Sequence, residues 1–141
     1  MGSGLRLVAY TDGASRGNPG AASYGAVVLD AAGGELRAIA APIGVATNNV
    51  AEYRGAIAAV EAALELGASA LELRMDSQLI VRQLEGRYRV KNAGLKPLFE
   101  KLRGLLDQLD EVAIRHVPRE ENRRADALAN AALDGRIEDV R

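Results

Sequence analysis

Four acidic residues in this sequence lie within short motifs where strands are expected to end or helices to begin. They are Asp12 in TDGASRGNPG, Glu52 in TNNVAEY, Asp76 in MDSQ and Asp126 in ENRRADALAN. Because they are far apart along the chain, only the fold can bring their carboxylates to one point. Clustered carboxylates can hold divalent metal ions against a phosphodiester. The leading hypothesis from these residues is a metal-dependent nuclease.

Each of these acidic residues also has a purely structural explanation. The alternatives are a turn at Asp12-Gly13, a capping box from Asn49 to Glu52, a helix cap at Asp76 or Ser77, and a surface pair between Asp126 and Arg123. Taken singly, each alternative is common. Only the joint occurrence of the four motifs favours the catalytic interpretation.

The composition restricts the chain to oxygen ligands for a metal. The chain has 141 residues, 48% hydrophobic and 26% charged, which fits one domain over 1–141 with flexible ends at 1–4 and 136–141. Cysteine is absent and His116 is the single histidine. Disulfides, thiolate zinc sites, cysteine nucleophiles and multi-histidine sites are therefore excluded. Carboxylates remain, and they suit Mg²⁺.

The net charge of −1 conceals an uneven distribution of charge. Basic residues gather in 82–103, where Glu85 and Glu100 are the acidic exceptions, and again in 115–124. A basic face beside an acidic cluster suits an anionic polymer. A solvated helix face explains such a run about equally well.

The sequence gives no sign of a membrane or secretory destination. No apolar stretch approaches the roughly 20 residues of a membrane span, and no secretory signal is recognisable. The start MGSGLR lacks the Ser or Thr of a myristoylation signal. We expect a cytoplasmic protein with no membrane partner.

Hydrophobic periodicity predicts five strands and four helices. Strands are expected over 5–11, 21–30, 35–43, 70–75 and 111–117. Helices are expected over 50–66, 77–85, 95–109 and 122–133. Residues 13–20 are expected to form a turn-rich loop, 31–34 a hairpin turn, and 137–141 a frayed end.

The order β-β-β-α-β-α-α-β-α determines the architecture that we expect. The first three strands follow one another closely and form an antiparallel meander. The last two are each reached through helices, so they join the sheet in parallel. The fold class is therefore α/β, a five-stranded mixed sheet with helices on its faces.

Over residues 5–134 the chain resembles ribonuclease H type 1, a family that cuts the RNA strand of RNA–DNA hybrids. The four motifs occur in that family's order, and the order of strands and helices matches the RNase H-like fold. The short segment 86–94 matches the subtype without a long basic protrusion. We also expect no N-terminal hybrid-binding domain of the kind that other members carry.

The resemblance implies two-metal-ion hydrolysis that leaves 5′-phosphate products. Two Mg²⁺ ions about 4 Å apart, with Mn²⁺ as a substitute, activate water and stabilise the leaving oxygen. Asp12 is expected to bridge the ions, Glu52 and Asp76 to hold one of them, and Asp126 to hold the other. Without metal, mutual repulsion would raise some of the carboxyl pKa values.

The same resemblance identifies candidate contacts with the hybrid. Those at matched minor-groove positions, where the 2′-hydroxyl is read, are Gly13, Ser15, Asn48 and Gln78. Those matched to a phosphate of the DNA strand are Asn18 and Thr47, while Asn49 is expected to cap the helix. Arg119 is a further candidate. Recognition by shape and sugar rather than by base sequence is expected.

His116 lies ten residues before Asp126, where many relatives carry a histidine in a glycine-flanked loop. The local sequence RHVPREEN lacks those glycines. Two readings of His116 stay open, a catalytic residue and the last residue of the fifth strand. Arg119 and Glu120 are further candidates for proton transfer.

Three function classes remain for comparison. The first is a monomeric endoribonuclease for RNA–DNA hybrids, with RNA–RNA duplexes open as a second substrate. The second is a non-catalytic nucleic-acid-binding module, which the presence of all four carboxylates disfavours. The third is a related nuclease or strand-transfer domain on the same superfold, which the TNNVAEY and GNPG motifs disfavour.

Overall fold

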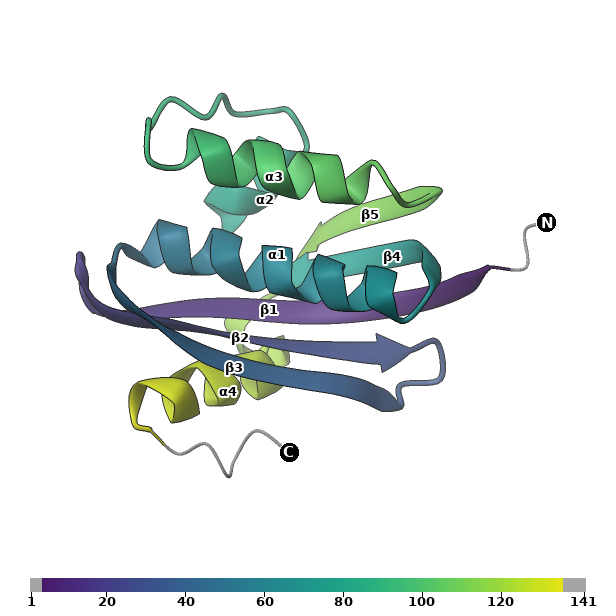
Figure 1. Ribbon diagram of the computed structural model, residues 1–141, viewed down its shortest axis with the longest axis horizontal. Coiled ribbons are helices and arrows are strands. Elements are labelled where there is room, and N and C mark those ends of the chain that lie inside the picture. The colour runs from purple at the N-terminus through teal and green to yellow at the C-terminus, as the bar shows by residue number, and fades with distance from the viewer. Residues whose placement is uncertain (1–3, 136–141) are drawn as a thin grey trace.

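The computed structural model describes residues 4–135, which form a single sheet with helices on both faces (Figure 1). The strands are β1 (Leu5–Gly17), β2 (Gly20–Asp30), β3 (Glu35–Ala46), β4 (Ala68–Met75) and β5 (Glu111–His116). The helices are α1 (Asn48–Glu65), α2 (Gln78–Leu84), α3 (Lys96–Leu106) and α4 (Arg123–Leu133), with a short 3-10 helix at Arg119–Glu121. This confirms the predicted order, while the expected fraying of 137–141 falls outside the described residues.

The sheet has the strand order β3-β2-β1-β4-β5. β1 pairs antiparallel with β2, and β2 with β3, whereas β4 lies parallel to both β1 and β5. The short hairpins produce the antiparallel pairs, and the helical crossovers produce the parallel ones. The predicted five-stranded mixed sheet is therefore confirmed.

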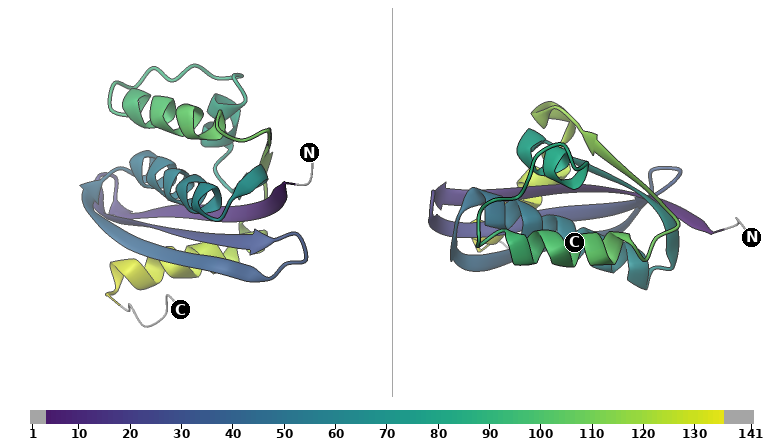
Figure 2. Two further views of the ribbon diagram at one scale, coloured as in Figure 1. Left: turned by 45° about the vertical axis from the view of Figure 1, so that its right-hand side comes forward. Right: turned by 90° about the horizontal axis from the view of Figure 1, so that it is seen from above.

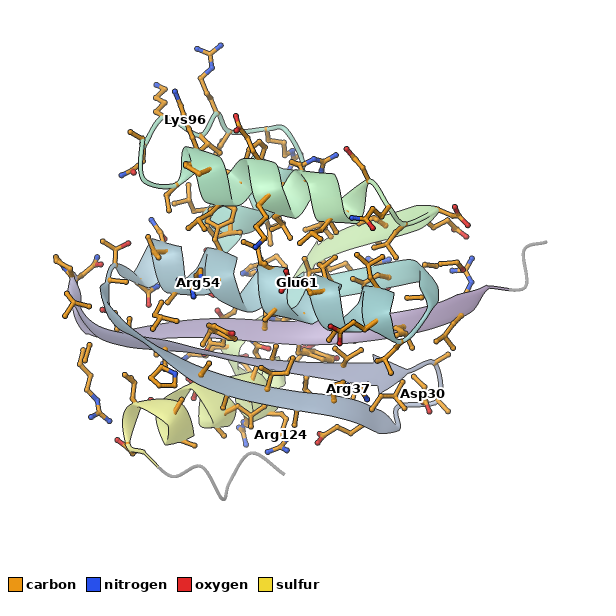
Figure 3. The ribbon with its side chains drawn as sticks, viewed as in Figure 1. Asp30, Arg37, Arg54, Glu61, Lys96 and Arg124 are labelled. Carbon is orange, nitrogen blue, oxygen red and sulfur yellow. The ribbon has the colours of Figure 1, made fainter. Side chains whose placement is uncertain are left out.

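The helices divide between the two faces of the sheet. Helix α1 packs on β1 to β4 and carries α3 on its outer side, while α4 packs on β1 to β3 from the opposite face (Figures 1 and 2). The core lies between the sheet and α1, where Leu73 of β4 and Tyr53 of α1 are fully buried. Charged side chains such as Arg54, Glu61 and Lys96 lie exposed on the helices (Figure 3). Within the described residues, no helix has the length and apolar character needed to cross a membrane.

Strand β1 is longer than predicted, and the expected loop at residues 13–20 was wrong. Its residues 13–17 continue the strand and pair with β2 as far as Gly17 opposite Gly20. Only Asn18 and Pro19 turn the chain, aided by Gly17 at φ 103°, a conformation that favours glycine. The loop-like composition misled the prediction because pairing with β2 satisfies these backbone groups. Asp12 consequently lies inside the sheet, opposite Gly25, and not in a terminal turn.

The predicted cap of α1 was wrong, and of the two caps weighed for α2 the structure shows Ser77. Helix α1 begins at Asn48, and its cap is Thr47 instead of Asn49, because Thr47 Oγ1 accepts the Val50 N–H at 3.2 Å. Ser77 caps α2, its Oγ accepting the Ile80 N–H at 3.3 Å. The acidic residues of both motifs are therefore free of capping roles.

The ends of β3 and α3 also differ from the predicted ones. Strand β3 runs to Ala46, past the expected end at 43, because Ala46 still pairs with Gly20 of β2. Helix α3 ends at Leu106, before the expected end at 109, although Leu109 stays buried at 7% exposure in the following turn. These changes leave the order of the elements unaltered.

Helix α4 lies unusually close to β2. A Cβ atom added to Gly25 would lie 2.2 Å from the Ala125 carbonyl oxygen and 2.6 Å from the Ala129 nitrogen. Ser23 of the same strand donates its buried hydroxyl to the Ala129 carbonyl at 2.5 Å. Gly25 permits the close approach and the Ser23 hydrogen bond holds it. Together they determine the distance between α4 and the sheet.

We predict that Gly25→Ala lowers the free energy of unfolding by about 1–3 kcal/mol, because the added methyl group meets helix backbone that cannot move aside. The matched control is Gly104→Ala in α3, where an added Cβ meets nothing within 4 Å. It should stabilise by about 0.5–1 kcal/mol, since alanine is the better helix former. Urea unfolding of the three proteins measures both effects. Equal stabilities would contradict the close seating of α4.

Candidate active site

Asp12 and Asp76 lie side by side because β1 and β4 are parallel neighbours. Thr11 pairs with Met75 in the register of these strands; Asp12 follows Thr11 within β1, and Asp76 follows Met75 directly after the end of β4. Glu52 reaches the same point from the first turns of α1. Ligand oxygens of Asp12, Glu52 and Asp76 all lie within 4.8 Å of one another. Three of the four predicted carboxylates are thus brought together.

Glu52 is held in this position by Gly13. The Gly13 N–H donates to Glu52 Oε1 at 3.0 Å. A Cβ atom at Gly13 would lie 2.4 Å from the Glu52 nitrogen, so only glycine allows α1 to approach β1 this closely. Asp12 is 6% exposed and Glu52 is 4% exposed, and both carboxyl groups are therefore largely removed from water.

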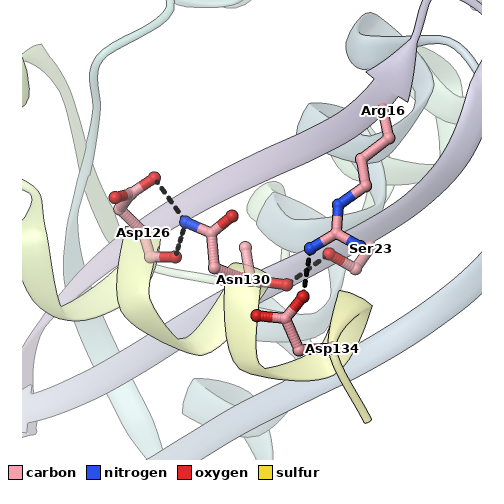
Figure 4. Close-up of polar contacts among 6 residues, drawn as sticks. Arg16, Ser23, Asp126, Asn130 and Asp134 are labelled. Atoms are coloured by element: carbon pink, nitrogen blue, oxygen red, sulfur yellow. Dashed lines mark hydrogen bonds and ion pairs between the residues drawn. The ribbon is translucent and has the colours of Figure 1, made fainter.

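Asp126 approaches from α4, on the other side of the sheet. It lines the same cavity, and its carboxyl is near enough to contribute to the raised pKa of Asp12. Among the described residues it stands outside the group whose oxygens are mutually within 4.8 Å. Its side-chain partner is Asn130 (Figure 4), rather than Arg123, the surface partner weighed from the sequence.

The carboxylates line an open cavity of about 340 Å³. Of the predicted substrate contacts, Gly13, Ser15, Asn48 and Arg119 lie in its wall. Asn18, Thr47, Gln78 and His116 lie outside that wall. Four of the seven predicted substrate contacts therefore lie directly around the carboxylates, whereas His116, the candidate catalytic histidine, does not.

The contacts outside the wall fall into two groups. Asn18 and Thr47 stand beside the cavity, where Asn18 Oδ1 accepts the backbone N–H of Asn48 at 3.0 Å. Gln78 is the exposed first residue of α2. His116 is the exposed last residue of β5, paired with Met75. The structure confirms His116 as the last residue of β5, and a catalytic role for it stays a prediction.

Two polar residues of the wall were not singled out from the sequence. Arg16 lies on the extended part of β1 and forms an ion pair with Asp134 at the end of α4 (Figure 4). Asn130 lies one helical turn after Asp126. The spacing of four residues on a helix would have revealed Asn130, whereas the wrongly expected loop concealed Arg16.

The surroundings of the site disfavour the ionised form of its carboxyl groups. Burial, followed by repulsion from Glu52, Asp76 and Asp126, raises the pKa of Asp12 to about 9. Burial and the nearby Asp76 raise the pKa of Glu52 to about 8, opposed by the hydrogen bond from Gly13. Hard divalent cations prefer several carboxylate oxygens, and such a charge would offset this repulsion. The residues therefore fit a divalent metal ion.

Comparison with known proteins agrees with the fold and with the motifs. The sequence matches a family described as reverse transcriptase-like over residues 10–132. It is 50% identical over 131 residues to Ribonuclease HI of Halobacterium salinarum, covering 93% of this chain and 66% of that protein. The chain spans 36% of several mycobacterial relatives that it also matches.

Solved structures extend the agreement to three dimensions. RNase H1 from Halobacterium salinarum superposes with a TM-score of 0.89 at 49% identity, covering 92% of this chain and 98% of that one. LC11-RNase H1, solved in complex with an RNA/DNA hybrid, superposes with a TM-score of 0.87 at 43% identity, covering 93% and 99%. On sequence, fold and the convergence of its acidic motifs, this chain belongs to the ribonuclease H type 1 family.

Proposed function

We propose that this chain is a divalent-metal-dependent endoribonuclease that hydrolyses the RNA strand of RNA–DNA hybrids and leaves 5′-phosphate products. The observation that carries the proposal is the group of Asp12, Glu52 and Asp76 oxygens within 4.8 Å. The complex of the related LC11-RNase H1 with an RNA/DNA hybrid supports the substrate class. We also propose that the protein is a cytoplasmic monomer and that residues 1–141 act as one catalytic domain.

The metal would be Mg²⁺, with Mn²⁺ as a substitute. Asp12, Glu52 and Asp76 would hold one ion, and Asp12 with Asp126 would hold the second. Bound there, a divalent ion activates water and neutralises charge on the leaving oxygen. The Gly13 N–H keeps Glu52 turned toward this point, and burial of Asp12 and Glu52 strengthens every electrostatic interaction inside the site.

The chain's polar groups beside the cavity are suited to a phosphate and a sugar. Asn18 Oδ1 and Thr47 Oγ1 each accept a backbone N–H of α1, so the amide nitrogen and the hydroxyl proton remain as donors for an anion. Both would contact a phosphate of the DNA strand. Ser15 and Asn48 in the cavity wall would approach the 2′-hydroxyl, as would Gln78 at the start of α2. Arg119 adds a positive charge for the scissile strand.

Cleavage of a labelled RNA–DNA hybrid in Mg²⁺, Mn²⁺ or EDTA tests the proposal. RNA–RNA, DNA–DNA and single-stranded RNA serve as parallel substrates. We expect metal-dependent cutting of the RNA strand within the hybrid. Folded protein that cuts no hybrid with either metal would contradict the proposal, and cutting of the DNA duplex would indicate a different nuclease.

We predict that Asp12→Asn lowers the rate of cleavage at least about 10³-fold, because it removes the carboxylate shared by both metal positions. The neutral side chain should leave the fold intact. Without metal the variant should be at least as stable as the wild type, since the Asp12 carboxyl with its pKa of about 9 must take up a proton on folding at neutral pH, and asparagine need not. Asp110→Asn, at an exposed position outside the cavity, is the matched control and should cleave normally. Full activity in Asp12→Asn would refute the metal site.

We predict that the metal-free protein loses stability as the pH rises. The pKa of Asp12 is about 9 in the folded protein against an ordinary value of 3.8. Between these values the folded state keeps a proton that the unfolded state has lost, so raising the pH removes stability.

Melting temperatures in EDTA at pH 5 and pH 8 measure this effect. The wild type should fall further between the two than Asp12→Asn, which carries no titrating group at that position. Added Mg²⁺ should restore stability mainly at pH 8, where the carboxylates are more ionised. The same pH dependence in both proteins would contradict the raised pKa.

A further inference from the structure

Asn130 of α4 donates two hydrogen bonds to Asp126, one helical turn before it (Figure 4). Its Nδ2 lies 3.0 Å from the backbone oxygen of Asp126 and 3.3 Å from Oδ1 of its carboxylate. The first bond fixes the amide against the helix. The second then directs an N–H at the carboxylate from a defined direction.

Asp126 lacks the restraints that hold Asp12 and Glu52. Asp12 and Glu52 are buried and are held by strand pairing and by the Gly13 N–H. Asp126 is only half-buried, and an aspartate side chain can adopt several staggered conformations. A fixed N–H favours the conformation that accepts its bond.

The backbone that carries Asn130 is itself fixed to the sheet. The Ala129 carbonyl, in the preceding residue, accepts the buried Ser23 hydroxyl at 2.5 Å. The absence of a side chain at Gly25 allows α4 to lie against β2. The amide of Asn130 therefore has a defined position relative to β1, which carries Asp12.

We propose that Asn130 is a positioning residue that orients Asp126 toward the cation it shares with Asp12. One carboxylate oxygen accepts the Asn130 N–H, and the other remains available to the metal. The inference rests on the function proposed above and adds a residue that acts through Asp126 without touching the substrate. Outer groups of this kind typically set metal affinity or activity by about 10- to 100-fold.

The decisive variant is Asn130→Ala, measured with Mn²⁺ alone and with the hybrid. In calorimetric titration of metal-free protein, the Mn²⁺ ion shared by Asp12 and Asp126 should bind at least about tenfold more weakly. The Mg²⁺ concentration for half-maximal cleavage should rise, and kcat at fixed Mg²⁺ should fall, with KM for the hybrid unchanged. Since alanine favours helix more than asparagine does, the melting temperature in EDTA should not fall, which separates positioning from a structural role.

Two further variants serve as rescue and control. Asn130→Gln keeps an amide donor one turn from Asp126 and should recover most of the affinity for Mn²⁺. Ala127→Asn places the same amide on the exposed face of the same helix, and should leave Mn²⁺ binding and cleavage unchanged.

The outcomes distinguish this inference from the proposed function. If the wild type cleaves the hybrid and Asn130→Ala has the same Mn²⁺ titration and Mg²⁺ dependence as the wild type, the role of Asn130 alone is overturned. A wild type that binds Mn²⁺ but cuts no hybrid would overturn the function, while the titration of Asn130→Ala would still decide the positioning role. A wild type that binds no Mn²⁺ would overturn both.

Discussion

Several carboxyl groups are buried close together where β1, β4 and α1 meet. The rest of the fold must hold them in place against their mutual repulsion. Asp12 and Glu52 are almost inaccessible to water, and Asp76 lies beside them. Each carboxylate raises the cost of ionising its neighbours. An uncompensated cluster of this kind lowers stability in the absence of metal, so the surrounding structure must hold it together.

Buried hydrogen bonds away from the carboxylates join the elements that carry them. Asn122, 1% exposed, donates its side-chain amide to the Thr11 carbonyl at 2.8 Å, and its backbone carbonyl accepts the Asp126 N–H at 3.1 Å. The start of α4 is thereby tied to β1. Tyr53 donates to Gln83 at 2.6 Å and ties α1 to α2. Leaving such a buried group unpaired costs about 1–3 kcal/mol, which opposes separation of the acidic residues.

Much of this arrangement can be predicted from the sequence. Helical crossovers imply parallel strands, and parallel strands place Asp12 beside Asp76. The fold class and the convergence of three acidic motifs follow from that logic. The sequence does not show that residues 13–17 extend β1, because pairing with β2 overrides a loop-like composition. It also cannot choose between Thr47 and Asn49 as the cap, since both are good capping residues and the packing of α1 decides.

Crystals soaked in Mn²⁺ and measured near its absorption edge would test the metal assignment most directly. We predict an anomalous peak coordinated by carboxylate oxygens of Asp12, Glu52 and Asp76. A second peak should lie between Asp12 and Asp126, and a bound hybrid should raise its occupancy. Saturating Mn²⁺ that leaves these carboxylates without a peak, or that binds only elsewhere on the surface, would contradict the assignment.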